Sequence, residues 1–432
     1  MRKLFLGFMI CITAGTISAQ DNVPADYRFT LEDCLSYALG NNYNLQTLEL
    51  TEEARADAYQ QSKMERLPSL NASLSENLNN SKGNSSTWIG NYGLNANVTL
   101  YQGGSITNAI EQSKLRQEQA SFQTSQYKNN LTIQILQAFL SVLGNEELLN
   151  YQEAVVTASE EQVKQGKAQI QVGKILESDY LLLEAQYAND KNNILNTQIS
   201  RDNSLLALKR LLSMSPMENL RVVYPDTTAI LTMAILPSMD DVLEMTVNTL
   251  PDLKISQYNI DIAKVGLKMS KSSYLPTVNL HGSIGTGHND YSGFGTQLSD
   301  RLNEQIGISL SIPIYDNNRT KSKVTQSRIA LQQAELDKKQ TELDIQQTVV
   351  TEYQNVYYAY NKYQTTKVRQ NAYSKTFDVY RAQFNVGSIT AVDLLQQQNN
   401  YISALNDYIQ SKYEFMLKRK VLDVYMGVQV KM

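Results

Sequence analysis

The sequence predicts an α+β membrane protein in which short strands of a transmembrane β-barrel alternate with very long helices. Three observations support this class. The N-terminus has the pattern of a secretory signal, residues 69–215 and 314–432 contain no proline, and four short segments alternate between apolar and polar residues. Because proline breaks helix interiors, the two proline-free tracts predict long helices, while the alternating segments predict strands.

The N-terminal stretch MRKLFLGFMICITAGTISAQDN predicts a signal peptide. Arg2 and Lys3 form a charged start, an apolar stretch follows, and small residues offer a cleavage site before position 20. The apolar stretch is too short to span a bilayer as a helix. We therefore expect residues 1–19 to be removed from the mature protein and residues 20–30 to form a linker.

Few residues of the expected mature chain could serve catalysis, metal binding or nucleic-acid binding. Only Cys34 would remain as a cysteine, and we expect it to be a small buried side chain. The histidines His281 and His288 are predicted to be polar surface residues, and they give no metal-ligand spacing. Removing residues 1–19 lowers the 39 basic residues by two against 43 acidic ones, for a formal charge of −6. We expect no enzyme activity, no cofactor and no nucleic-acid partner.

An internal repeat organises the chain. LEDCLSYALGNNYNLQ at 31–46 matches MDDVLEMTVNTLPDLK at 239–254, an offset of 208 residues. QIQVGKILESDYLLLEAQ at 169–186 matches QFNVGSITAVDLLQQQ at 383–398, and their Val-Gly pairs are 214 residues apart. The six additional residues fall in a longer loop of the second copy. Each half is predicted to run helix, two strands, very long helix, Val-Gly turn and helix.

The repeat predicts where each part of the chain begins and ends. The expected parts are a helix at 31–67, a β-hairpin at 68–102, long helices with a first turn at 103–212, a connector at 213–240, a helix at 241–274, a β-hairpin at 275–316, long helices with a second turn at 317–421, and a C-terminal segment at 422–432. The two hairpins are thus predicted to hold the four strands.

The two predicted hairpins have one apolar and one polar face. In 70–78 and 92–100 the even positions are apolar apart from Glu76, while Asn, Ser, Gly and Thr take the odd ones. Residues 306–314 repeat this alternation and residues 278–286 follow it more weakly. A period of two predicts strands. A soluble hairpin would explain one such strand, but four of them in an exported chain favour a membrane β-barrel.

The residues around these strands also suit a membrane barrel. Loops 79–89 and 287–302 are rich in Ser, Asn, Gly and Asp, as extracellular loops are. Aromatic residues near the strand ends suit an interfacial girdle; they are Trp88, Tyr92, Tyr101, Tyr291, Phe294 and Tyr315. Four strands cannot close a barrel, because the smallest barrels have about eight strands and an open edge is not tolerated in lipid. Copies of the chain are therefore expected to pool their strands.

The first long helix is predicted from Ser105 to about Gln165, roughly 90 Å in length. Two apolar stripes with heptad spacing run along it. They are Leu131, Ile135, Ala138 and Val142 in one stripe and Ile133, Leu136, Leu140 and Leu143 in the other. Stripes on opposite flanks suit a helix that lies between two neighbours, in a solid bundle or a hollow cylinder. The scarcity of other apolar residues favours the cylinder.

From about Leu31 to Met426 the sequence resembles the TolC family of outer-membrane efflux proteins. The resemblance depends on the repeated plan and on the turn sequences VGKILESD and VGSITAVD. It implies a homotrimer with a 12-stranded outer-membrane barrel, a long periplasmic helical barrel, and a mixed equatorial domain from 213–240 and 422–432. It also implies passive exit of small molecules that an inner-membrane transporter and a periplasmic adaptor deliver through the outer membrane of a Gram-negative bacterium.

The resemblance assigns roles to residues at both turns. An adaptor-binding tip would comprise Val172, Gly173, Lys174, Val386, Gly387 and Ser388. An aperture would be surrounded by Asp179, Phe384, Asp393 and Gln396. The glycines are also expected on physical grounds, because glycine permits the backbone conformation that ends a helix. Asp393 three residues after Thr390 also fits a capping box, which is an alternative to the aperture role.

The sequence departs from the family pattern at the aperture. Ile389 stands where some members have a latching arginine, and Gln396 stands where they have a second carboxylate. We expect a ring of Asp393 to attract cations, with a closed state that is either looser or held by other residues such as Lys174. Two other functions fit the same features: the exit duct of a type I protein secretion system, and a non-conducting scaffold that spans the periplasm.

Overall fold

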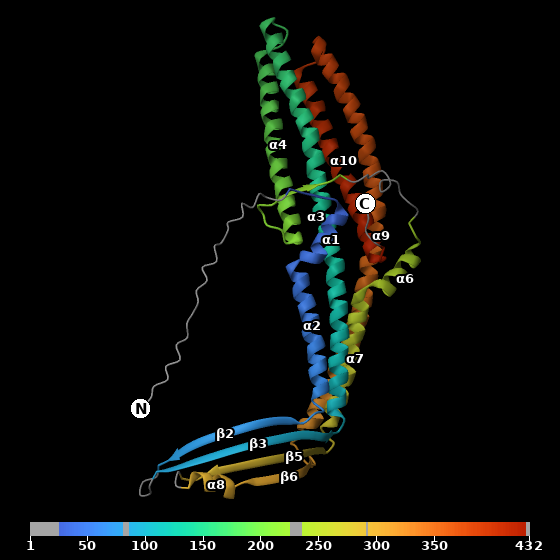
Figure 1. Ribbon diagram of the computed structural model, residues 1–432. Coiled ribbons are helices and arrows are strands. Elements are labelled where there is room, and N and C mark those ends of the chain that lie inside the picture. Colours follow the sequence, from blue (N-terminus) through green and yellow to red (C-terminus); the bar gives the residue numbers. More distant parts are fainter. Residues whose placement is uncertain (1–25, 81–85, 225–235, 291–292, 429–432) are drawn as a thin grey trace, which may run out of the picture.

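The computed structural model describes residues 26–80, 86–224, 236–290 and 293–428, so the predicted signal peptide and Tyr291 lie outside the described residues. Figure 1 shows an elongated molecule with a four-stranded sheet at one end and helices that run away from it side by side. Helices and strands occupy separate regions, which confirms the predicted α+β class. No helix in the described ranges is both long and apolar enough to cross a membrane.

Two very long helices run from the sheet to the far end of the molecule (Figure 1). Helix α3 (Ser105–Gln171) has 67 residues and α9 (Arg319–Val386) has 68, which corresponds to about 100 Å each. Each packs with one helix near the sheet and with another near the far end. The partners of α3 are α2 (Tyr43–Met64) and α4 (Glu177–Leu212). The partners of α9 are α7 (Pro251–Ser272) and α10 (Ala391–Tyr425). Both α7 and α10 also pack on α3, which joins the two halves.

Both apolar stripes predicted on α3 contribute to one buried core. Leu131 and Ile135 of one stripe and Leu136 and Leu143 of the other are each at most 1% exposed. They pack with residues of α4, α10 and the short helix α1 (Leu31–Asn41). The helix therefore lies between neighbours on two flanks, as the double stripe predicts. Cys34 of α1 is fully buried in this core, as expected, and burial raises the pKa of its thiol to about 12.

Near the middle of the molecule the chain forms a small mixed region. Strand β1 (Asp26–Phe29) pairs in parallel with β4 (Asn219–Val222). Helix α6 (Met239–Thr249) packs against α9, and its Val242 is buried in a second core with Val349 and Phe415. The residues between β4 and α6, 225–235, lie outside the described part of the chain.

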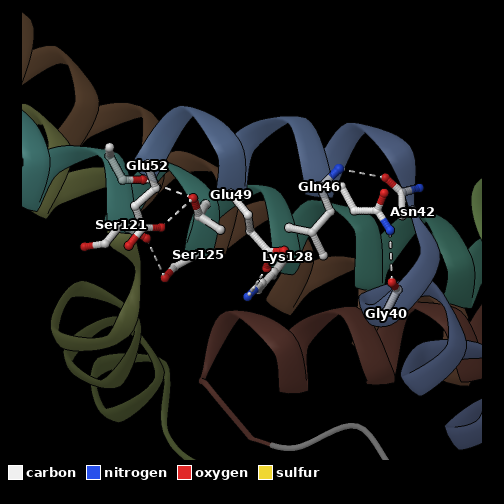
Figure 2. A network of polar contacts seen from close by, with 11 residues as sticks. Gly40, Asn42, Gln46, Glu49, Glu52, Ser121, Ser125 and Lys128 are labelled. Carbon is white, nitrogen blue, oxygen red and sulfur yellow. Dashed lines mark hydrogen bonds and ion pairs between the residues drawn. The ribbon is translucent and has the colours of Figure 1, made fainter. Parts of the chain in front are cut away.

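Polar contacts hold much of α2 against α3 (Figure 2). Glu49 forms an ion pair with Lys128 at 3.2 Å, and Thr124 donates a hydrogen bond to Glu52, also at 3.2 Å. Only Leu45 and Ser62 of α2 are buried. Exposed ion pairs contribute at most about 1 kcal/mol each. Helix α2 is therefore held by many weak contacts rather than by a continuous apolar seam.

The four predicted strands form one antiparallel sheet with the order β2-β3-β5-β6. They are β2 (Ser69–Asn79), β3 (Thr87–Gln102), β5 (Thr277–His288) and β6 (Asn303–Ser311). The pairing of β3 with β5 joins the two repeats. Val98 pairs with Leu280, and Leu280 pairs with Ile308, so the register collects the apolar residues on one face. Strands β2 and β6 each leave one edge without a strand partner among the described residues.

The second hairpin differs from the sequence-based expectation in its loop. Residues 287–302 were expected to form a polar loop, but they contain the short helix α8 (Phe294–Asp300). Thr286 of β5 donates a hydrogen bond to the carbonyl of Leu298, which holds α8 against the sheet. The longer loop of the second copy therefore accommodates an additional element.

The prediction that His288 is a surface residue is wrong, because its side chain is fully buried. Its Nε2 lies 3.1 Å from a carboxylate oxygen of Glu76, and its ring packs on Phe294 with centroids 4.9 Å apart. The imidazole lies over Gly90 of the neighbouring strand, where a Cβ atom would be only 2.4 Å from Nε2. The space at this glycine is what allows the histidine to be buried. His281 is half-buried.

Candidate functional site at the two helix turns

The predicted tip residues lie in two turns at the end of the molecule opposite the sheet (Figure 1). The first turn joins α3 to α4 and the second joins α9 to α10. Gly173 has a φ of +69° and Gly387 a φ of +82°, in the left-handed region that side-chain-bearing residues rarely adopt. Both glycines are therefore required by the backbone conformation of the turns.

Both turns use the same hydrogen-bond pattern. The amide of Gly173 donates to the carbonyl of Ile170 at 3.1 Å, and the amide of Lys174 donates to Gln169 at 2.9 Å. In the second turn Gly387 and Ser388 donate to the carbonyls at the equivalent positions, Phe384 and Gln383, each at 3.0 Å. This pair of bonds is a Schellman motif, which satisfies the last carbonyls of a helix. The repeated turn sequences thus form one local structure twice.

The helices that leave the turns begin differently. Thr390 caps α10 through a capping box: its hydroxyl donates to the Asp393 carboxylate at 2.7 Å, and the amide of Asp393 donates to the same hydroxyl at 3.2 Å. The predicted capping box of Asp393 is therefore confirmed, and its aperture role stays a prediction. These hydrogen bonds from Thr390 lower the pKa of Asp393, which is exposed. Helix α4 begins after Leu176 without a side-chain cap.

An apolar cluster packs the second turn against α4. Phe384, one of the predicted aperture residues, is only 1% exposed and packs with Leu183 of α4 and Leu394 of α10. Ile389 packs against the same cluster. An arginine at position 389 would place a charge beside this apolar surface, so the isoleucine suits the packing found here. Of the other predicted aperture residues, Asp179 is half-buried and Gln396 is exposed.

The outer surface of the turns carries exposed apolar residues. Val172 is 69% exposed and Val386 is 77% exposed. Leu176 and Val392, which the sequence did not single out, add to this surface at 70% and 55% exposure. Each lies a few residues beyond a helix-ending glycine, where no core is expected, and the sequence does contain that signal. Lys174 and Ser388 are exposed beside them, so the turns offer an apolar surface with a polar rim.

No group of three or more His, Cys, Asp or Glu side chains is placed to hold a metal ion in the described ranges. The turns themselves present two exposed valines, a lysine, a hydroxyl and a capped carboxylate at helix ends.

Comparisons with known proteins agree with this architecture. The family model for outer membrane efflux proteins matches residues 34–213 and 242–428. The outer membrane protein TolC of Vibrio cholerae is 21% identical, over 100% of this chain and 99% of that protein. The alkaline protease secretion protein AprF of Pseudomonas aeruginosa is 22% identical, over 69% of this chain and 61% of that protein.

A crystal structure of CusC has the same fold, with a TM-score of 0.79, 16% identity, and 92% of both chains covered. Together with the sequence matches, this confirms the resemblance inferred from the two turn sequences and the repeat. Because the family model spans most of the chain, the chain belongs to the outer membrane efflux protein family.

Proposed function

We propose that the chain forms a homotrimeric channel that lets small molecules leave the cell passively after an inner-membrane transporter and a periplasmic adaptor deliver them. The observation that carries this proposal is the position of the two ends. A sheet with an exposed apolar face lies at one end of the molecule, and two exposed glycine turns lie about 100 Å away at the other.

The sheet supports the membrane part of the proposal. Leu74, Ile306 and Ile308 are 76%, 80% and 68% exposed on one face, which would be unfavourable in water and favourable in lipid. The free edges of β2 and β6 present unpaired backbone groups, which lipid cannot satisfy. Pairing β6 of one copy with β2 of the next removes every edge. Three copies would give the 12 strands and a helical barrel around one pore.

The turns support the adaptor part of the proposal. Val172, Gly173 and Lys174 form one contact surface, and Val386, Gly387 and Ser388 form its repeat. Exposed apolar residues on a rigid helix end are typical of a protein-binding surface. Asp393 and Gln396 are exposed and Asp179 is half-buried near these turns; they would line the aperture, with Phe384 packed behind them. Cross-linking from Lys174 or Ser388 should capture the adaptor.

The exit duct of a type I protein secretion system is a second candidate, favoured by one observation. AprF, which aligns with 69% of this chain, is named as a protease secretion protein. The two functions share the trimer and the tip but differ in cargo. Deleting the gene should abolish export of a small toxic compound in the first case and of a protein in the second. A non-conducting scaffold would show no current in a planar bilayer.

Replacing Asp393 by Asn is expected to reduce the cation selectivity of the channel. Three carboxylates around the proposed aperture would attract cations and repel anions. Since the hydrogen bonds from Thr390 lower the pKa of Asp393, the carboxylate stays ionised below the pH at which an ordinary aspartate is protonated. The wild-type selectivity should therefore persist into mildly acidic solution. Reversal potentials across a KCl gradient in planar bilayers measure this.

The matched control for this experiment is Asp240→Asn, which removes one exposed negative charge from α6, away from the turns. Its reversal potential should equal that of the wild type. Equal reversal potentials for the Asp393 variant and the wild type would show that the carboxylate only caps α10.

A further inference from the structure

A fully buried carboxylate lies between the two helix pairs near the turns. Asp190 of α4 is only 2% exposed, and Ser159 of α3 and Gln398 of α10 are each 1% exposed. Gln398 Nε2 donates to Asp190 Oδ2 at 2.9 Å, Gln186 Nε2 donates to Oδ1 at 2.8 Å, and the Ser159 hydroxyl also donates to Oδ2. The carboxylate therefore connects three helices.

This contact lies close enough to the second turn to affect how firmly that turn is held. Helix α3 packs chiefly on α4, and α9 on α10. Of the second pair, α10 also packs on both α3 and α4. Gln398 lies about 10 Å along α10 from its first residue, Ala391. Two apolar layers flank the contact, with Leu395 toward the turns and Leu405 away from them. The carboxylate thus lies between two apolar layers of this joint.

No positive charge in the described ranges compensates Asp190. The side chains that contact it, Ser159, Gln186 and Gln398, do not titrate. Of the nearby charged residues, Lys164 on α3 pairs with Glu160 and Glu161 at the surface, and Lys191 on α4 lies over the ring of Tyr187. Neither of these two lysines, nor any other charged side chain among the described residues, contributes to the pKa shift of Asp190. Burial raises this pKa, and the three hydrogen bonds offset only part of the effect.

A proton can reach Asp190 without unfolding of the helices. A cavity of about 250 Å³ between α3, α4 and α10 is lined in part by Asp190, Asn193 and Asn406. The Ser159 hydroxyl also lies 2.8 Å from the carbonyl of Val155. When Asp190 gains a proton, the serine can donate to that carbonyl and accept from the new acid. Every partner then keeps a hydrogen bond, and the buried charge is gone.

We propose that Asp190, Ser159 and Gln398 form an acid-responsive contact that sets how firmly α10, and with it the second turn, is held against α3 and α4. Only the importance of that turn for the adaptor rests on the proposed function. The direction follows from the raised pKa: the closed contact binds the proton more tightly than the open one. Acid therefore strengthens the contact, and the gain is lost as the pH rises through the raised pKa.

Hydrogen exchange of residues 391–402, measured on the full chain in detergent, tests the proposal. After correction for the intrinsic pH dependence, opening of this segment should decrease as the pH falls from about 8 toward 4.5. Between the ordinary and the raised pKa, the opening equilibrium can change by at most about tenfold per pH unit. Asp190→Asn, which has no titrating charge, should show low opening across the whole range. Ser159→Ala removes a donor to the carboxylate and should move the transition to higher pH.

The matched control is Glu184→Gln, which removes an exposed carboxylate on the same helix; it should keep the wild-type pH dependence. A wild-type segment that opens equally at every pH would overturn the proposal, and so would an unchanged pH dependence in Asp190→Asn. The measurement needs no adaptor. A failure of adaptor cross-linking with the pH dependence intact would contradict the proposed docking role alone.

Discussion

Gly387→Asp and Gly173→Asp are expected to abolish efflux while leaving the trimer in the outer membrane. Both glycines have positive φ values, and a Cβ atom at either would meet nothing within 4 Å. The substitution therefore places a charged side chain in open space at the proposed docking surface, next to the exposed Val172 or Val386. Drug susceptibility of a deletion strain that carries each variant measures efflux. A heat-modifiable trimer band on a gel measures assembly.

Two further variants separate charge from backbone strain. Gly387→Asn has nearly the shape of the aspartate and tolerates the left-handed conformation equally well, so a smaller loss of efflux would identify the charge as the cause. Gly40→Asp adds the same side chain where a Cβ also meets nothing within 4 Å, but φ is not positive and the site is on α1. It should leave resistance unchanged. Full resistance in both Asp variants at the turns would contradict the docking role.

The features that sequence predicted well are those that local periodicity and local hydrogen bonds determine. The alternation in 70–78 and 306–314 predicts strands with one apolar face, because a strand exposes alternate residues wherever it lies. The glycine of each turn is equally local: the Schellman bonds of Gly173 close within six residues of the chain. The first long helix extends to Gln171 rather than Gln165 because those bonds, not composition, end it.

The features that sequence missed depend on residues far apart in the chain. Asp190 is buried only because Ser159 and Gln398 reach it from two other helices, and nothing near it in sequence distinguishes it from an exposed aspartate. His288 is buried because Gly90, which lies nearly two hundred residues earlier in the chain, leaves room for its ring. Periodicity predicts which face of a helix or strand a residue occupies, but not which distant residue packs against that face.

Replacing Ile308 by Arg is expected to prevent assembly of a stable trimer in the membrane. Ile308 lies in the middle of β6 and is 68% exposed on the apolar face, beside Leu280 of the neighbouring strand. If this face meets lipid, an arginine near the middle of the bilayer costs about 2–4 kcal/mol in each chain. Three copies would carry this cost into one barrel. The yield of heat-modifiable trimer in outer-membrane fractions, and its urea midpoint, should both fall.

Ser309→Arg is the matched control, because it introduces the same side chain one residue along the same strand. Ser309 pairs with Asn279, on the polar face of the sheet. If that face lines a water-filled pore, the arginine stays hydrated, and the trimer should survive with an altered conductance. A larger loss of trimer for Ser309→Arg than for Ile308→Arg would show that the face of Ser309, not that of Ile308, meets lipid. Equal tolerance of both would show that neither face meets lipid, and the barrel proposal would fail with it.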